Sequence, residues 1–165
     1  MKLNNFNYLE NKIFTDLIAF SRLCHLWKLK DEKIIFTNGC FDILHRGHIS
    51  YLAAAADLGT KLIVGINSDA SVKKLKGPSR PINSFEDRAL ALAALGFIDA
   101  VVEFKEDTPE KLIKLVSPQI LVKGGDYKIE EIIGAKWLAQ NGGETIVIPF
   151  TKGYSTTNFL NDLKK

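Results

Sequence analysis

Two histidines stand close together in residues 37–48, which read TNGCFDILHRGH. His45 and His48 are three residues apart, with Gly47 between them, and the segment follows the apolar run 33–36. If a helix begins near Gly47, its unpaired N–H groups and both imidazoles can face one anion and stabilise charge on a phosphate oxygen. Two histidines at a helix start can also be surface or capping residues. Their place after a strand favours a phosphate site.

The hydrophobic pattern alternates between strand-like and helix-like segments along most of the chain. Continuous apolar runs predict buried strands at 33–37, 61–67, 100–104, 120–123 and 144–149. Helical periodicity, capping residues and closing glycines predict helices at 47–58, 84–95, 109–116, 129–141 and 156–163. This alternation predicts an α/β fold, a Rossmann-like doubly wound parallel sheet of about five strands with helices on both faces.

The chain of 165 residues has the length of one domain. Residues 1–30 are expected to form an N-terminal helical lead-in, and residues 31–165 a single domain built on this sheet. Apolar spacing in the lead-in predicts the face that packs on the main domain, with Phe14, Leu17, Ile18, Ser21 and Leu26.

Charge and cysteine content argue against several classes of protein. The net charge of +3 is small and the basic residues are scattered, so nucleic acid is not an expected partner. The local cluster of Lys73, Lys74 and Lys76 is either a solvated face or a phosphate contact. Cys24 and Cys40 have no metal-ligand spacing and suggest reduced thiols in a cytoplasmic protein. The N-terminus lacks the pattern of a signal peptide, and no apolar run is long enough to span a membrane.

The segments that follow the predicted strands are the candidate site, because ligands bind beyond the carboxyl ends of strands in doubly wound sheets. These segments are 37–48, 67–76, 123–127 and 151–157. The sequence contains no G-x-G-x-x-G after the first predicted strand, no P-loop, no G-x-S-x-G and no zinc-ligand spacing. The usual dinucleotide, P-loop and α/β-hydrolase fingerprints are therefore excluded.

The string TNGCFDILHRGH resembles the H-x-G-H motif of the nucleotidylyltransferase superfamily, and residues 153–157 (GYSTT) resemble its S-T-T signature. GINSDASVKKLKGPSRPI, FEDRALALAALGFIDAVV, EDTPEKLI and LVKGGDY closely resemble the branch that joins ATP to D-glycero-β-D-manno-heptose 1-phosphate. The similarity extends over residues 25 to 163. In many bacteria this activity is half of a bifunctional protein with a sugar kinase, and the absence of a kinase half here predicts a stand-alone form.

The resemblance implies transfer of AMP from ATP to the heptose phosphate, for lipopolysaccharide core or related glycans. It also implies a homodimer and Mg²⁺ held mainly by the ATP phosphates. The implied catalytic residues are His45, His48, Lys73 and Arg88. The implied nucleotide-binding residues are Thr37, Asn38, Gly39, Cys40, Phe41, Gly47, Lys76, Gly124, Ser155, Thr156 and Thr157. The implied substrate-binding residues are Asp42, Arg80, Lys123, Gly125, Asp126 and Tyr127.

Purely structural roles remain alternatives for several of these residues. Arg88 can instead be a surface charge or a partner of Ser84, and Asp42 can cap its own turn. Residues 124–126, Gly-Gly-Asp, can be an ordinary turn. Ser155 or Thr156 can cap the last helix.

Two other functions also remain. The first is a cytidylyltransferase for a small alcohol phosphate such as glycerol 3-phosphate. The related glycerol-phosphate enzymes carry an arginine before S-T-T where residues 150–154 read FTKGY, which weakens this alternative and leaves Lys152 as a substitute. The second is a non-catalytic nucleotide-binding domain. That alternative predicts a broken signature, whereas both histidines and the S-T-T hydroxyls are present.

Overall fold

A parallel sheet forms the centre of the computed structural model, which describes residues 4–149. Within that range it has six strands in the order β1-β4-β3-β2-β5-β6. They are β1 (Ile13–Phe14), β2 (Ile34–Gly39), β3 (Lys61–Asn67), β4 (Ala100–Phe104), β5 (Ile120–Gly124) and β6 (Glu144–Ile148). All neighbouring pairs are parallel. The chain runs outward from β2 to β4 and then returns to place β5 on the other side of β2, so the strand order reverses between β2 and β5.

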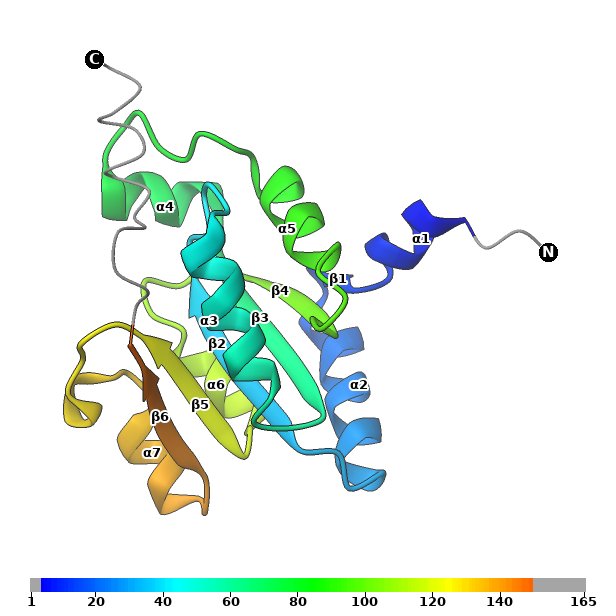
Figure 1. The fold of residues 1–165 in the computed structure, drawn as a ribbon, viewed down its shortest axis with the longest axis vertical. Helices are drawn as coiled ribbons and strands as arrows, with labels where there is room; N and C mark the ends of the chain where they lie inside the picture. The colour runs from blue at the N-terminus through cyan, green and yellow to red at the C-terminus, as the bar shows by residue number, and fades with distance from the viewer. Residues whose placement is uncertain (1–3, 150–165) are drawn as a thin grey trace.

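Helices cover both faces of this sheet (Figure 1). They are α1 (Asn5–Glu10), α2 (Leu17–Leu29), α3 (Arg46–Ala56), α4 (Asp69–Lys76), α5 (Phe85–Ala93), α6 (Glu110–Val116) and α7 (Ala135–Gln140), with a 3₁₀ turn η1 (Ile129–Glu131). Alternate residues of each strand point to opposite faces of the sheet and form two hydrophobic cores. One core packs against α3 and α5, and the other against α2, α6 and α7. The predicted doubly wound α/β fold is therefore confirmed. Within residues 4–149, no helix is both long and apolar enough to cross a membrane.

The N-terminal segment differs from the predicted helical lead-in. It contributes β1, which pairs with β4 and makes the sheet one strand wider than expected. The predicted inner face of α2 is also wrong in part, because Phe20 and Cys24 are buried while Ile18 and Leu26 are exposed. The apolar residues on α2 occupy more than one face, so periodicity alone does not identify the buried one. The division into 1–30 and 31–165 stays a prediction.

Two helices also differ from the expected ones. The predicted helix 129–141 is interrupted, with η1 and α7 separated by Gly134, whose φ is +90°. A Cβ on Gly134 would lie 2.7 Å from Ile113 Cδ1, so close packing adds to the need for glycine there. The segment after β3, for which no helix was predicted, contains α4, capped by Ser68. The predicted helix 156–163 lies outside the described residues.

Candidate active site

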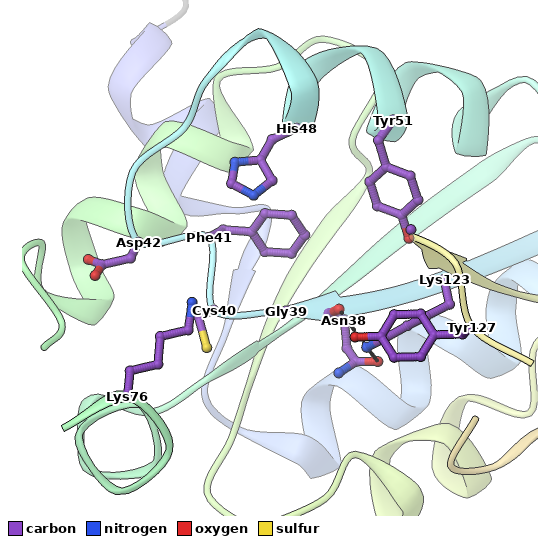
Figure 2. A pocket seen from close by; sticks show the side chains of 11 residues that line it. Asn38, Gly39, Cys40, Phe41, Asp42, His48, Tyr51, Lys76, Lys123 and Tyr127 are labelled. Atoms are coloured by element: carbon purple, nitrogen blue, oxygen red, sulfur yellow. Dashed lines mark hydrogen bonds between the residues drawn. The ribbon is translucent and has the colours of Figure 1, made fainter. Parts of the chain in front are cut away.

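A cavity of about 240 Å³ opens at the carboxyl ends of β2 and β5, beside the N-terminus of α3 (Figure 2). Within residues 4–149, its lining comes from the predicted segments 37–48, 67–76 and 123–127 and from one further residue of α3. The lining residues are Asn38, Gly39, Cys40, Phe41, Asp42, His48, Tyr51, Lys76, Lys123, Gly124 and Tyr127. An adjoining cavity of about 220 Å³ shares three of these residues, Asn38, Lys123 and Tyr127. The cavity therefore lies where the strand order reverses, as expected for a ligand site in this fold.

The two histidines lie at the start of α3 and contact each other. Their rings stack with centroids 3.8 Å apart, and Nδ1 of His45 accepts a hydrogen bond of 3.3 Å from the backbone N–H of His48. His45 is thus the N-cap of α3, as the capping interpretation predicted. His48 is the histidine that lines the cavity. Gly47 is buried between them in the first turn of the helix.

The His48 imidazole is held neutral at ordinary pH. Burial lowers its pKa to about 4, and the neighbouring charges of His45 and Lys76 act in the same direction. Burial also lowers the pKa of His45. A neutral imidazole still donates one N–H hydrogen bond, so His48 can bind a phosphate oxygen without carrying a charge of its own.

The turn after β2 shapes the wall beside His48. Phe41 has φ of +46° and places its ring edge-on to the His48 ring, with centroids 5.2 Å apart. A Cβ on Gly39 would lie 3.0 Å from the Phe41 ring, which explains a glycine at this position. Cys40 points its thiol toward Asn67, at 3.7 Å from the side-chain oxygen. Close packing against the Phe41 ring, rather than a left-handed backbone, therefore favours glycine at position 39.

Among the described residues, two lysines reach this cavity, and they come from different elements. Lys76 comes from the end of α4 and Lys123 from β5. The Lys123 ammonium lies 3.4 Å from both oxygens of Asn38 and 6.0 Å from the centre of the Tyr127 ring. Burial lowers the pKa of Lys123. Lys73 and Lys76 are both exposed, but only Lys76 contributes to the lining, so the structure favours Lys76 over Lys73.

Asp42 and Arg80, both predicted to bind substrate, are paired with each other. Arg80 Nε lies 2.6 Å from Asp42 Oδ2, and Asp42 Oδ1 accepts hydrogen bonds from the backbone N–H groups of Ile82 and Asn83. Figure 2 shows the Asp42 carboxylate directed away from His48. Asp42 thus fastens the loop after α4 to the turn after β2, which is close to the turn-capping interpretation.

Arg88, predicted to bind phosphate, is buried, with a relative exposure of 1%. Its guanidinium donates to the carbonyls of Cys40, Asn67 and Asn83 and to the Asp69 carboxylate, at 2.6–3.2 Å. The alternative of a surface charge is therefore wrong. These contacts join the turn after β2 to the end of β3, and direct phosphate contact by Arg88 stays a prediction.

In the segment after β5, some residues line the cavity and others lie at the surface. Gly124 and Tyr127 line the cavity. Gly125 has φ of +125°, and Asp126 is exposed outside the lining. Thr37 is fully buried with its hydroxyl bonded to Tyr51, so that hydroxyl is directed at the protein. Ser155, Thr156 and Thr157 lie outside the described residues.

Tyr51 lines the cavity although it was not among the residues predicted for the site. It follows His48 by three residues on α3, and residues at this spacing share one helix face. That spacing was the available signal, but a tyrosine in an alanine-rich helix also fits ordinary core packing. No group of three or more His, Cys, Asp or Glu within residues 4–149 is arranged to hold a metal ion. Magnesium held mainly by ATP phosphates does not need such a group and stays a prediction.

Comparisons with known proteins agree with this geometry. The chain is 52% identical to the bifunctional protein HldE of Proteus mirabilis (strain HI4320) over 162 residues, which is 98% of this chain and 33% of that protein. It is 56% identical to HldE of Vibrio cholerae serotype O1 (strain ATCC 39541) over 135 residues, 82% of this chain and 28% of that protein. The chain thus spans about a third of the length of these curated relatives.

Solved structures share the fold. The lipopolysaccharide core biosynthesis protein from Thermoplasma volcanium GSS1 superposes with a TM-score of 0.60 at 25% identity, covering 75% of this chain and 99% of that one. Pantoate-beta-alanine ligase from Francisella tularensis superposes with a TM-score of 0.61 at 17% identity, covering 92% and 76%, which shows the fold alone. Residues 36–161 match the family described as Cytidylyltransferase-like. The chain therefore belongs to the cytidylyltransferase-like family and is a nucleotidyltransferase.

Proposed function

We propose that this chain transfers AMP from ATP to D-glycero-β-D-manno-heptose 1-phosphate, giving ADP-heptose and pyrophosphate. The observation that carries the proposal is the identity of 52% to HldE over 98% of this chain. The likeness to a lipopolysaccharide core biosynthesis protein agrees with it. The heptose acceptor itself is inferred from the resemblance of residues 65–82 and 121–127 to that branch.

The reaction needs positioning and charge neutralisation more than covalent catalysis. An ionised phosphate oxygen of the heptose 1-phosphate attacks the α-phosphorus of ATP and forms the new P–O bond. The bond from that phosphorus to the bridging oxygen of the β-phosphate breaks, and pyrophosphate leaves with the electron pair. Because the attacking oxygen is already ionised, no side chain must remove a proton from it.

Each cavity residue has a place in this scheme. The neutral His48 imidazole donates a hydrogen bond to a non-bridging α-phosphate oxygen, where charge grows in the transition state. Lys76 and Lys123 approach from opposite sides and neutralise the phosphates (Figure 2). Tyr127 and Asn38 border both cavities and are placed to contact a ligand that extends from one to the other.

Three further statements belong to the proposal. Mg²⁺ enters with ATP, and when bound it neutralises charge on the phosphates. The enzyme works in the cytoplasm, where its two cysteines stay reduced; both are free thiols in the structure. It acts as a homodimer on small-molecule substrates alone. Analytical ultracentrifugation tests the dimer, and a magnesium titration of turnover tests the metal.

A pyrophosphate-release assay with two nucleotides and two acceptors tests the main proposal. ATP and CTP are each combined with heptose 1-phosphate and with glycerol 3-phosphate. We expect turnover with ATP and heptose 1-phosphate alone. Turnover only with CTP and glycerol 3-phosphate would establish the cytidylyltransferase alternative instead. A chain that binds a nucleotide in calorimetry but turns over none of the four pairs would be the non-catalytic domain.

A further inference from the structure

Tyr51 is the largest side chain that α3 buries, and no role in the reaction has been given to it so far. We propose that the Tyr51 hydroxyl is a positioning group that fixes His48 relative to Lys123. The proposal rests on the function proposed above, because it concerns the same phosphate site. Tyr51 touches the cavity, yet its hydroxyl is bonded to the protein rather than directed at a ligand.

The hydroxyl joins three elements of the fold. Tyr51 lies on α3, and its hydroxyl donates a hydrogen bond of 3.2 Å to the Val122 carbonyl on β5. A second, short hydrogen bond links it to the Thr37 hydroxyl on β2. Since a phenol has one proton and Val122 receives it, Thr37 is the donor in the second bond. One buried oxygen atom therefore connects a helix to two neighbouring strands.

Each partner lies next to a group that faces the cavity. Val122 precedes Lys123 in β5, and Thr37 precedes Asn38, whose oxygens lie 3.4 Å from the Lys123 ammonium. His48 lies one helical turn before Tyr51 on the same face of α3. When one turn of a helix is displaced, the next turn moves with it. The position of the Tyr51 hydroxyl therefore determines the position of His48 relative to β2 and β5.

The rest of α3 buries little apolar surface. Besides Tyr51, the helix buries only Leu52, Ala55 and Gly47, and two of these are very small. Apolar packing is non-directional and tolerates sliding of a smooth helix along the sheet. Hydrogen bonds have preferred distances and angles, so the two hydrogen bonds of the Tyr51 hydroxyl set the position of α3 along the sheet, which apolar packing does not fix. Burial also raises the pKa of Tyr51 to about 12, so its hydroxyl keeps the proton across the physiological range.

The test uses two conservative variants and a matched control. Tyr51→Phe keeps the ring and removes the hydroxyl, and Thr37→Val removes only the donor on β2. Tyr8→Phe on α1 is the control, because it is the same change at an exposed position outside both cavities. Pyrophosphate release gives kcat and KM at a temperature where circular dichroism shows every variant folded. The ¹⁵N spectrum of the imidazoles reports on His48, which is readily assigned among three histidines.

We expect Tyr51→Phe to lower kcat about tenfold or more while both KM values stay within about twofold, because a small misplacement of a catalytic group slows the chemical step. Thr37→Val should give a smaller change in the same direction. The His48 ring signals should move in both variants and stay in place in Tyr8→Phe. A kcat for Tyr51→Phe within about twofold of the parent, or unchanged His48 signals, would overturn the proposal.

The two proposals fail in different ways. If the parent protein turns over none of the four substrate pairs, the proposed function fails, whereas the His48 spectrum still tests the positioning role. If the parent is active and Tyr51→Phe raises KM without lowering kcat, the function stands and the positioning role is refuted. Equal fractional losses in turnover and folded protein would likewise show that Tyr51 only supports the fold.

Discussion

Two groups of charged side chains lie at the carboxyl edge of the sheet, and they are used differently. One group faces the cavity and consists of His48, Lys76 and Lys123. The other, here named the clasp, is bonded within the protein and consists of Asp42, Arg80, Asp69 and Arg88. Apart from Asp69, the residues of both groups are ones that the family resemblance implies as catalytic or binding residues. Asp42 also lines the cavity, but its carboxylate is bonded to Arg80 and to the backbone of Ile82 and Asn83, whereas the side chains of the first group face the cavity.

The difference shows that residue type and place after a strand do not by themselves separate a binding group from a structural one. Arg88 has donors directed at three backbone carbonyls and a carboxylate, so its hydrogen-bonding capacity is used inside the protein. Lys123 makes two hydrogen bonds of 3.4 Å to Asn38, and its ammonium lies 6.0 Å from the centre of the Tyr127 ring. A group of the first kind holds the loops of the site in place, and one of the second kind is placed to bind an anion.

The largest effect is expected at the cavity group. His48→Ala should lower kcat about 10²–10³-fold, because loss of one donor to the transition-state oxygen has this effect in comparable sites. Pyrophosphate release measures it. His25→Ala, an exposed histidine on α2, is the control and should keep parental turnover. If His48→Ala kept parental turnover while His25→Ala lost it, the reaction would not take place at the cavity that His48 lines.

At the clasp, the expected loss is in stability. Arg88→Met should lower the free energy of unfolding by about 2–4 kcal/mol, because it leaves buried carbonyls and Asp69 without their partner. Urea denaturation measures this loss. Lys74→Met, which breaks an exposed pair with Asp107, is the control and should cost less than about 1 kcal/mol.

The same variant separates the two roles of Arg88. If Arg88→Met is destabilised but turns over normally at a low temperature where it is folded, Arg88 acts through the loops alone. If stability is unchanged and the KM for ATP rises strongly, Arg88 contacts phosphate directly, as the family resemblance implied. In that case the contacts in the structure would describe a form that changes when the nucleotide binds.

Much of the fold was predictable because its signals are local. The strands 61–67 and 100–104 match β3 and β4 at both ends, since continuous apolar runs mark strands buried on two faces. Ser84 caps α5 as expected and bonds to Asp87. The break at Gly134 was not predictable, because it depends on Ile113, which is near in space but distant in sequence.

The site was predictable to the same extent. The segments 37–48 and 123–127 meet at the cavity, as their positions after β2 and β5 imply. The pairing of Asp42 with Arg80 joins residues 38 positions apart, and no local pattern shows it. Tyr51 was not identified from the sequence for a related reason. Its role depends on Thr37 and Val122, which the sheet brings to it from two different strands.

A smaller effect distinguishes two lysines on α4. Lys76→Met should raise the KM for ATP about tenfold, because a charge-assisted contact to phosphate contributes roughly 1.5–3 kcal/mol. Lys73→Met removes the same charge from the same helix at an exposed position outside the cavity, so its KM should stay within about twofold. Steady-state kinetics at constant ionic strength measures both. Equal effects would mean that only the overall charge of α4 matters.

The smallest effect concerns the proton on His48. Its pKa is lowered from 6.5 to about 4 in the folded protein, so between these pH values the unfolded chain binds more protons than the folded one. Stability from this group is therefore present above pH 6.5 and is lost as the pH falls toward 4. Between pH 7 and pH 5 we expect a loss of about 1 kcal/mol, after allowance for solvent around the partly exposed ring.

His48→Gln isolates that contribution, because glutamine keeps a polar side chain but does not titrate. Urea denaturation at pH 7 and pH 5 should show a smaller loss in the variant than in the parent, while all other groups titrate alike in both. An equal loss in both proteins would mean that His48 is protonated as easily in the folded chain as in the unfolded one. The imidazole would then be a cation below about pH 6.5, and in that range the cavity would differ less from the clasp, because all three of its groups would carry a charge.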